Sequence, residues 1–84
     1  MQIGIEMSLY PLQADYIPVI QSFIDRLNTD PRLRVVTNTM STQVFGDYDV
    51  IFGVVQRELR ATFEACGKAV LVLKVLGPLG EDRG

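Results

Sequence analysis

The apolar residues of this chain change their spacing along its length in an order that few folds accommodate. Residues 2–10 alternate between polar and apolar side chains, which predicts a strand with one buried face made of Ile3, Ile5, Met7 and Leu9. Pro11 cannot donate to a strand ladder and ends this strand, and Asp15 offers an N-cap to the helix expected next. The apolar stripe of that helix recurs at helical spacing through Ile17, Ile20, Phe23, Ile24 and Leu27.

The middle of the chain predicts a hairpin and then a second helix. Residues 33–38 alternate in hydropathy, and residues 41–45 form another short strand after a tight turn. Asp47 is the expected N-cap of the second helix, and Gly67 is its expected stop. The apolar stripe of this helix runs through Ile51, Val55, Leu59, Phe63 and Cys66.

Residues 68–76 predict the final strand. They are rich in leucine and β-branched residues. Residues 70–73 are all apolar, so both faces of the strand would carry apolar side chains, which favours a strand covered on both faces. Residues 77–84 combine glycine, proline and charges and predict a flexible C-terminal tail. We therefore expect a single domain over residues 1–76.

This order of elements, βαββαβ, predicts an α+β fold of the ferredoxin-like type. Its four-stranded antiparallel sheet would carry both helices on one face, because two helices are too few to cover two faces. The open face would then be half apolar, which predicts a homo-oligomer with an interface at Tyr10, Val70, Val72 and Lys74. A chain of 84 residues buries only about 60% of its unfolded surface, so a partner would add needed stability.

The composition disfavours several functions. The chain has 8 Lys and Arg against 10 Asp and Glu, a net charge of -2 and no basic run, which argues against nucleic-acid binding. It has one cysteine and no histidine, so it lacks the cluster that structural zinc or a nucleophile–base pair requires and fits a reducing cytoplasm. No apolar stretch approaches the roughly 18 residues of a membrane span, so we expect neither membrane insertion nor a signal peptide.

Three stretches of the sequence resemble the YkoF-like thiamine-binding protein family. They are EMSLYPL at residues 6–12, TNTMSTQVFGD at residues 37–47 and LKV at residues 73–75. The resemblance covers nearly the whole chain and implies a single-repeat member with the ferredoxin-like fold. Members of that family associate through their sheets, and some bind thiamine or its hydroxymethylpyrimidine part. The resemblance therefore implies a dimer or, preferably, a tetramer.

A thiamine-type ligand needs a carboxylate, hydroxyls or amides, and an apolar wall. The candidate set that offers these groups is Glu6, Ser8, Asn38, Met40, Ser41 and Thr42. Glu6 is expected to accept from the exocyclic amine or to lie near the cationic ring, while the small polar residues satisfy ring nitrogens and the hydroxyl arm. Met40 and Tyr10 are expected to pack on ring faces. In this fold the first and third strands are neighbours, so Glu6 and Ser8 should approach residues 41–43.

Simpler interpretations stay open for these residues. Glu6 can be a surface carboxylate paired with Lys74, and residues 38–41 can serve only to shape a tight turn. Strand parity also stays open, because a slip of one residue exchanges Thr42 for Gln43 on the open face. Cys66 lies on the apolar stripe and is expected to be a core residue.

The sequence predicts no catalytic residues, no metal site and no cofactor. Glu6 is the one acidic residue within a predicted strand, and Asp47 and Asp49 have no further clustered ligands. We therefore expect a non-enzymatic cytoplasmic protein that binds thiamine, hydroxymethylpyrimidine or a related heterocycle as a homo-oligomer. The alternative is an oligomeric interaction or regulatory module without a small ligand, which uses its open sheet face for assembly or docking. A regulatory domain that binds an amino acid is a third possibility, on fold analogy alone.

Overall fold

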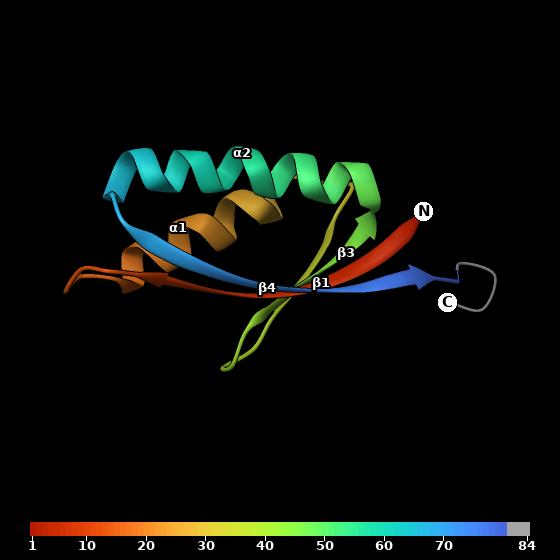
Figure 1. The fold of residues 1–84 in the computed structure, drawn as a ribbon, viewed down its shortest axis with the longest axis horizontal. Helices are drawn as coiled ribbons and strands as arrows, with labels where there is room; N and C mark the ends of the chain where they lie inside the picture. The colour runs from red at the N-terminus through yellow and green to blue at the C-terminus, as the bar shows by residue number, and fades with distance from the viewer. Residues whose placement is uncertain (81–84) are drawn as a thin grey trace.

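The central element of the fold is the first strand, which lies between two neighbours in a four-stranded antiparallel sheet. A computed structural model describes residues 1–80. Its elements are β1 (Gln2–Pro11), α1 (Ile17–Asn28), β2 (Arg34–Thr37), β3 (Thr42–Asp47), α2 (Tyr48–Cys66) and β4 (Ala69–Leu79). The strand order is β2-β3-β1-β4, and both helices lie on the same side of the sheet (Figure 1). The predicted ferredoxin-like fold is confirmed.

The core forms between the helices and the apolar face of β1. Because β1 is a central strand, its alternating apolar residues are all covered, as the sequence period predicts. They pack with buried residues of α1, α2 and β3. The buried apolar residues are Ile3, Ile5, Met7, Leu9, Phe23, Leu27, Leu33, Val44, Ile51, Val54 and Val55.

Two of the three helix ends that were predicted from the sequence are found in the structure. Asp47 caps α2 by accepting from the Asp49 N–H at 3.2 Å, and Gly67 ends α2 with a φ of 83°. The prediction that Asp15 caps α1 is wrong, because the N-cap is Tyr16 and no side chain bonds the first turn. Pro18 lies in that turn, and its fixed φ and missing N–H favour a helix start without a capping side chain.

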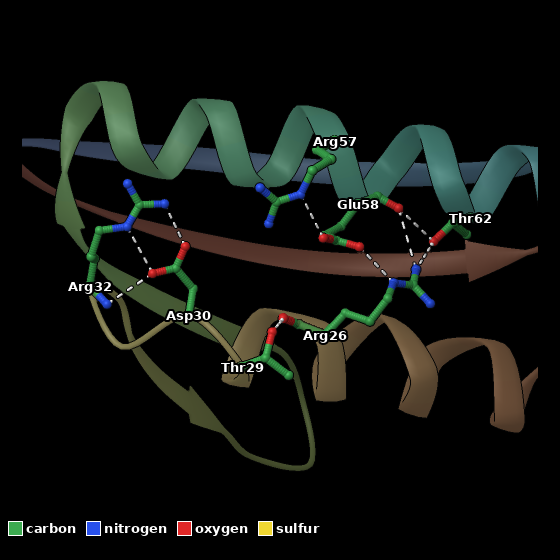
Figure 2. A network of polar contacts seen from close by, with 7 residues as sticks. All are labelled: Arg26, Thr29, Asp30, Arg32, Arg57, Glu58 and Thr62. Carbon is green, nitrogen blue, oxygen red and sulfur yellow. Dashed lines mark hydrogen bonds and ion pairs between the residues drawn. The ribbon is translucent and has the colours of Figure 1, made fainter.

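The buried face of α2 differs from its predicted apolar stripe toward the C-terminal end. Phe63 is 43% exposed, whereas Glu58 and Thr62 are buried. The reason is an arginine on the other helix: Arg26 Nε lies 2.7 Å from Glu58 Oε1, and Arg26 Nη2 donates to the Thr62 hydroxyl at 2.8 Å (Figure 2). Polar groups can be buried here because each of them has a partner.

Two charged contacts beside this helix pair shift carboxyl pKa values. Burial acts to raise the pKa of Glu58, but hydrogen bonds from Arg57 and Arg26 outweigh it and hold this pKa below its ordinary value. In the turn after α1, hydrogen bonds from the Arg32 side chain and backbone lower the pKa of Asp30 to about 2 (Figure 2). Both carboxylates therefore stay ionised at neutral pH.

Strand β4 is longer than predicted and is covered on one face only. It continues to Leu79, which pairs with Gln2, so residues 77–79 of the expected tail belong to the sheet. The rest of that tail, from residue 81 onward, lies outside the described residues. The expectation of two covered faces is wrong for the single chain, because β4 is an edge strand and Val70 and Val72 are each 47% exposed on the side without helices.

Candidate ligand-binding site

The turn between β2 and β3 is shaped by the side chain of Asn38. Its Oδ1 accepts from the backbone N–H of Met40 at 2.8 Å and from that of Ser41 at 2.9 Å. The backbone N–H of Asn38 donates to the Ser41 carbonyl at 3.0 Å. An asparagine that bonds the backbone two and three residues ahead is typical of tight turns. The turn role considered from the sequence is therefore present, and it uses the carbonyl oxygen of the Asn38 amide.

Two side chains of β1 hold this turn against the sheet. The Ser41 hydroxyl donates to Glu6 Oε2 at 3.0 Å, and the Ser8 hydroxyl donates to the Met40 carbonyl at 3.4 Å. Glu6 also lies 3.7 Å from Lys74 Nζ, with side chains 42% and 78% exposed. The expected approach of Glu6 and Ser8 to the turn is thus found, as is the Glu6–Lys74 pairing. An ion pair this exposed contributes little to stability.

A groove of about 600 Å³ opens between the hairpin, the end of β1 and the first two turns of α1. It gathers five of the six predicted ligand residues, which are Ser8, Asn38, Met40, Ser41 and Thr42. Its apolar walls come from Tyr10, Tyr16, Ile20, Phe23 and Ile24, among others. None of its lining residues is charged, and its volume lies within the roughly 300–1,000 Å³ of small-molecule sites.

Glu6 does not line this groove. The register pairs Glu6 with Gln43 and places both on the open face, at a smaller hollow of about 300 Å³ that also includes Phe45 and Lys74. The register also resolves the parity of β3: Thr42 is 6% exposed on the helix side. Thr42 therefore borders the groove from within the core, and Gln43 takes the place on the open face.

Several groove residues, among them Tyr16 and Ile20, were not identified as site candidates from the sequence. Ile20 belongs to the predicted apolar stripe of α1, although it is only half-buried, and no role was predicted for Tyr16. The exposure of Ile17 at the start of α1 shows that this stripe is not fully covered at its N-terminal end. A signal was available, because Tyr16 stands four residues before Ile20, a spacing that puts two side chains on the same face of a helix.

The open face of the sheet carries the residues predicted for an interface. Tyr10 pairs with Val70 and Ser8 with Val72 across the β1–β4 ladder. The large exposed apolar side chains on this face are Tyr10, Val36, Val70, Val72 and Leu76. At its centre the Phe45 ring lies over Gly4, where an added Cβ would come within 2.9 Å of the ring. The Arg34 guanidinium lies on the same ring, 4.3 Å from its centroid.

Residues 2–73 match the model of the YKOF-related family. The chain belongs to this family. No curated protein matches it by sequence, and none of the helices within residues 1–80 has the length and hydropathy needed to cross a membrane.

Solved structures share the fold of this YKOF-related protein along almost its whole length. A Streptococcus pneumoniae protein has a TM-score of 0.83 at 23% identity, with 96% of this chain and 89% of that one covered. A Thermotoga maritima protein for which a role in thiamine biosynthesis or salvage has been proposed has a TM-score of 0.85 at 16% identity, with 99% and 94% covered. A hypothetical protein of Methanocaldococcus jannascii has a TM-score of 0.81 at 23% identity, with 98% and 90% covered.

Proposed function

We propose that this YKOF-related protein is a non-enzymatic cytoplasmic protein that binds thiamine, hydroxymethylpyrimidine or a related heterocycle in the groove between α1 and the β2–β3 hairpin. The observation that carries this proposal is the convergence in one groove of hydroxyl and amide groups from β1 and the hairpin with apolar walls from α1. A site of that composition suits a flat ring with a few polar atoms. Family membership and the likeness to the Thermotoga protein support the same ligand class.

The groove has distinct surfaces for the ring and for its polar atoms. Tyr10 and Met40 offer an aromatic face and a polarisable thioether that pack well on a heterocycle. Asn38, Ser41 and Thr42 stand at the hairpin wall and would meet its donors and acceptors. The lining residues supply no carboxylate, histidine or lysine to act as a general base, and the proposal gives the two lining tyrosines a packing role. Binding without chemistry is therefore the activity we propose.

Isothermal titration calorimetry with thiamine and with hydroxymethylpyrimidine tests this proposal. The assembly state is first fixed by light scattering, so that the number of chains per site follows from the stoichiometry. We expect saturable binding of at least one ligand, and about five- to tenfold weaker binding in Ser41→Ala, because a hydrogen bond is lost. Ser22→Ala is the matched control, since Ser22 is an exposed α1 serine outside the groove. A folded oligomer that gives no heat with either ligand would refute the proposal.

A second proposal concerns assembly, and it is favoured by the apolar side chains on the open face. We propose that copies of this chain associate through that face as a dimer or tetramer, whether or not a ligand is bound. Tyr10, Val70 and Val72 lie side by side there and are each about half exposed. Exposed apolar patches of this kind mark interaction surfaces.

Sedimentation velocity on Val72→Glu tests the assembly proposal. A buried carboxylate without a partner is costly, so this variant should sediment as a monomer at concentrations where the unmodified protein is oligomeric. Gln56→Glu adds the same charge to an exposed position of α2 and should leave the sedimentation coefficient unchanged. An unchanged coefficient in Val72→Glu would exclude this part of β4 from the contact.

A further inference from the structure

The hydroxyl proton of Ser41 is already committed to a carboxylate. Ser41 lines the groove, and its Oγ donates at 3.0 Å to Oε2 of Glu6, a residue that borders the neighbouring smaller hollow and not the groove. A carboxylate only accepts, so the single hydroxyl hydrogen must point toward Glu6. A ligand can then hydrogen-bond only to the lone pairs of Ser41 Oγ. Ser41 therefore offers the groove a hydrogen-bond acceptor.

Asn38 has the opposite polarity. Two backbone N–H groups, those of Met40 and Ser41, point at its Oδ1 and fix the orientation of the amide. Its Nδ2 carries two hydrogens and makes no hydrogen bond to any other group within residues 1–80. Asn38 therefore offers the groove a donor. The hairpin wall thus carries an acceptor at Ser41 and a donor at Asn38.

We infer that the hairpin selects heterocycles with an amino donor beside an unprotonated ring nitrogen over their oxo analogues, and that Glu6 is the positioning residue that sets this preference through Ser41. The inference rests on the proposed function, because it assigns a polarity to the same groove. A 4-aminopyrimidine edge presents a donor next to an acceptor. The 4-oxo analogue presents a carbonyl acceptor next to a ring N–H and so reverses both partners. When a donor faces a donor or an acceptor faces an acceptor, both polar groups are left without a hydrogen bond. This changes the relative affinity of two ligands more than a small difference in their size does.

Lys74 makes Glu6→Gln an informative substitution. Its ammonium group lies 3.7 Å from Glu6 Oε1, the oxygen that Ser41 does not use. In the glutamine variant this cation favours the amide oxygen on its own side, which turns the amide NH2 toward Ser41. The Ser41 hydroxyl then accepts from the glutamine and is free to donate into the groove. The substitution thus reverses the polarity of Ser41 and leaves its side chain in place.

Calorimetric titration of 4-amino-5-hydroxymethyl-2-methylpyrimidine and its 4-oxo analogue tests the inference. We expect the unmodified protein to bind the amino compound about tenfold or more tightly. In Glu6→Gln the amino compound should weaken, the oxo compound should strengthen and the ratio should fall toward one or below. In Ser41→Ala the amino compound should weaken with no gain for the oxo compound. Glu64→Gln makes the same chemical change on exposed α2 and should keep the original ratio.

Each outcome decides between the inference and the function on which it rests. A preference for the amino compound that persists unchanged in folded Glu6→Gln would overturn the role of Glu6 and leave the binding function intact. Equal affinities in the unmodified protein would overturn the donor and acceptor assignment. Absence of binding by both compounds would overturn the proposed function as well. If Glu6→Gln does not fold, the ratio in the unmodified protein and its fall in Ser41→Ala still test the donor and acceptor assignment.

Discussion

The polar contact between the two helices makes a measurable contribution to stability, and Arg26→Met tests its size. Arg26 donates to Glu58 Oε1 at 2.7 Å and to the Thr62 hydroxyl at 2.8 Å, and the Glu58 side chain is only 12% exposed. Methionine keeps most of the length of the side chain and removes the charge. Glu58 and Thr62 would then stay buried with fewer hydrogen-bond partners. Leaving a buried polar group without its partner costs more free energy than removing both groups.

The expected loss is about 2 kcal/mol in the free energy of unfolding. Hydrogen bonds to charged groups contribute roughly 1.5–3 kcal/mol each. The loss is smaller than the sum of these two hydrogen-bond contributions, because the Arg26 side chain is 34% exposed and because Arg57 still donates to Glu58 Oε2 at 2.9 Å. A domain of this size has a total stability of only about 5–10 kcal/mol, so the effect is large in proportion.

Urea unfolding followed by circular dichroism measures this loss. The slope with denaturant should stay the same in Arg26→Met, because the surface exposed on unfolding barely changes. Arg60→Met is the matched control: Arg60 is exposed on α2 and makes no ion pair within residues 1–80, so its loss should cost under about 0.5 kcal/mol. A double-mutant cycle with Glu58→Gln isolates the pair itself. A change below about 0.5 kcal/mol in Arg26→Met would refute the reasoning.

Three further predictions concern pH and two glycines. Because the pKa of Glu58 is lower in the folded chain than its ordinary value of 4.5, its stabilisation is present above that value and is lost as the pH falls through the folded pKa. Unfolding free energies at pH 7 and pH 3 should therefore differ less in Glu58→Gln than in the unmodified protein, and an equal difference would contradict this. Gly53→Ala should raise stability by about 0.5–1 kcal/mol, because Gly53 is exposed within α2 and an added Cβ meets no atom within 4 Å. Gly67→Ala should lower it by about 1 kcal/mol, because φ is +83° there. Thermal unfolding compares the two alanine variants, and shifts of the same sign would count against the argument.

Local signals explain how much of the fold was predictable. The alternation in β1 and the cap at Asp47 depend on neighbours in sequence, and both are found as expected. The burial of Glu58 and Thr62 was not predictable, because it depends on Arg26 from an element more than 30 residues away. The continuation of β4 to Leu79 has the same kind of cause, since pairing with Gln2 extends a segment whose composition favours a tail.

The candidate site was predictable in its residues but not in its geometry. Asn38, Met40 and Ser41 were identified from the groups that a thiamine-type ligand needs and from the family resemblance, and the structure places them together at one groove. Glu6 was assigned to the same site because β1 and β3 were expected to be adjacent. Adjacency alone does not say where along β1 the groove opens. It opens from Met7 onward, where the pairing with β3 ends, so Glu6 lies before the groove and holds Ser41.

The stacking of Phe45 on Gly4 gives the sheet a means of rejecting wrong alignments as it forms. Gly4 and Phe45 are direct partners in the β1–β3 ladder, and the ring occupies the space that a side chain would fill. A shift of β3 by two residues keeps the same faces but places the ring opposite Gln2 or Glu6, each of which carries a long side chain. In the native alignment the ring covers Gly4, while Arg34, its partner in the β2–β3 ladder, lies on the same ring. The same alignment brings Ser41 to Glu6, so a misaligned hairpin would lose its aromatic packing and its binding polarity in a single error.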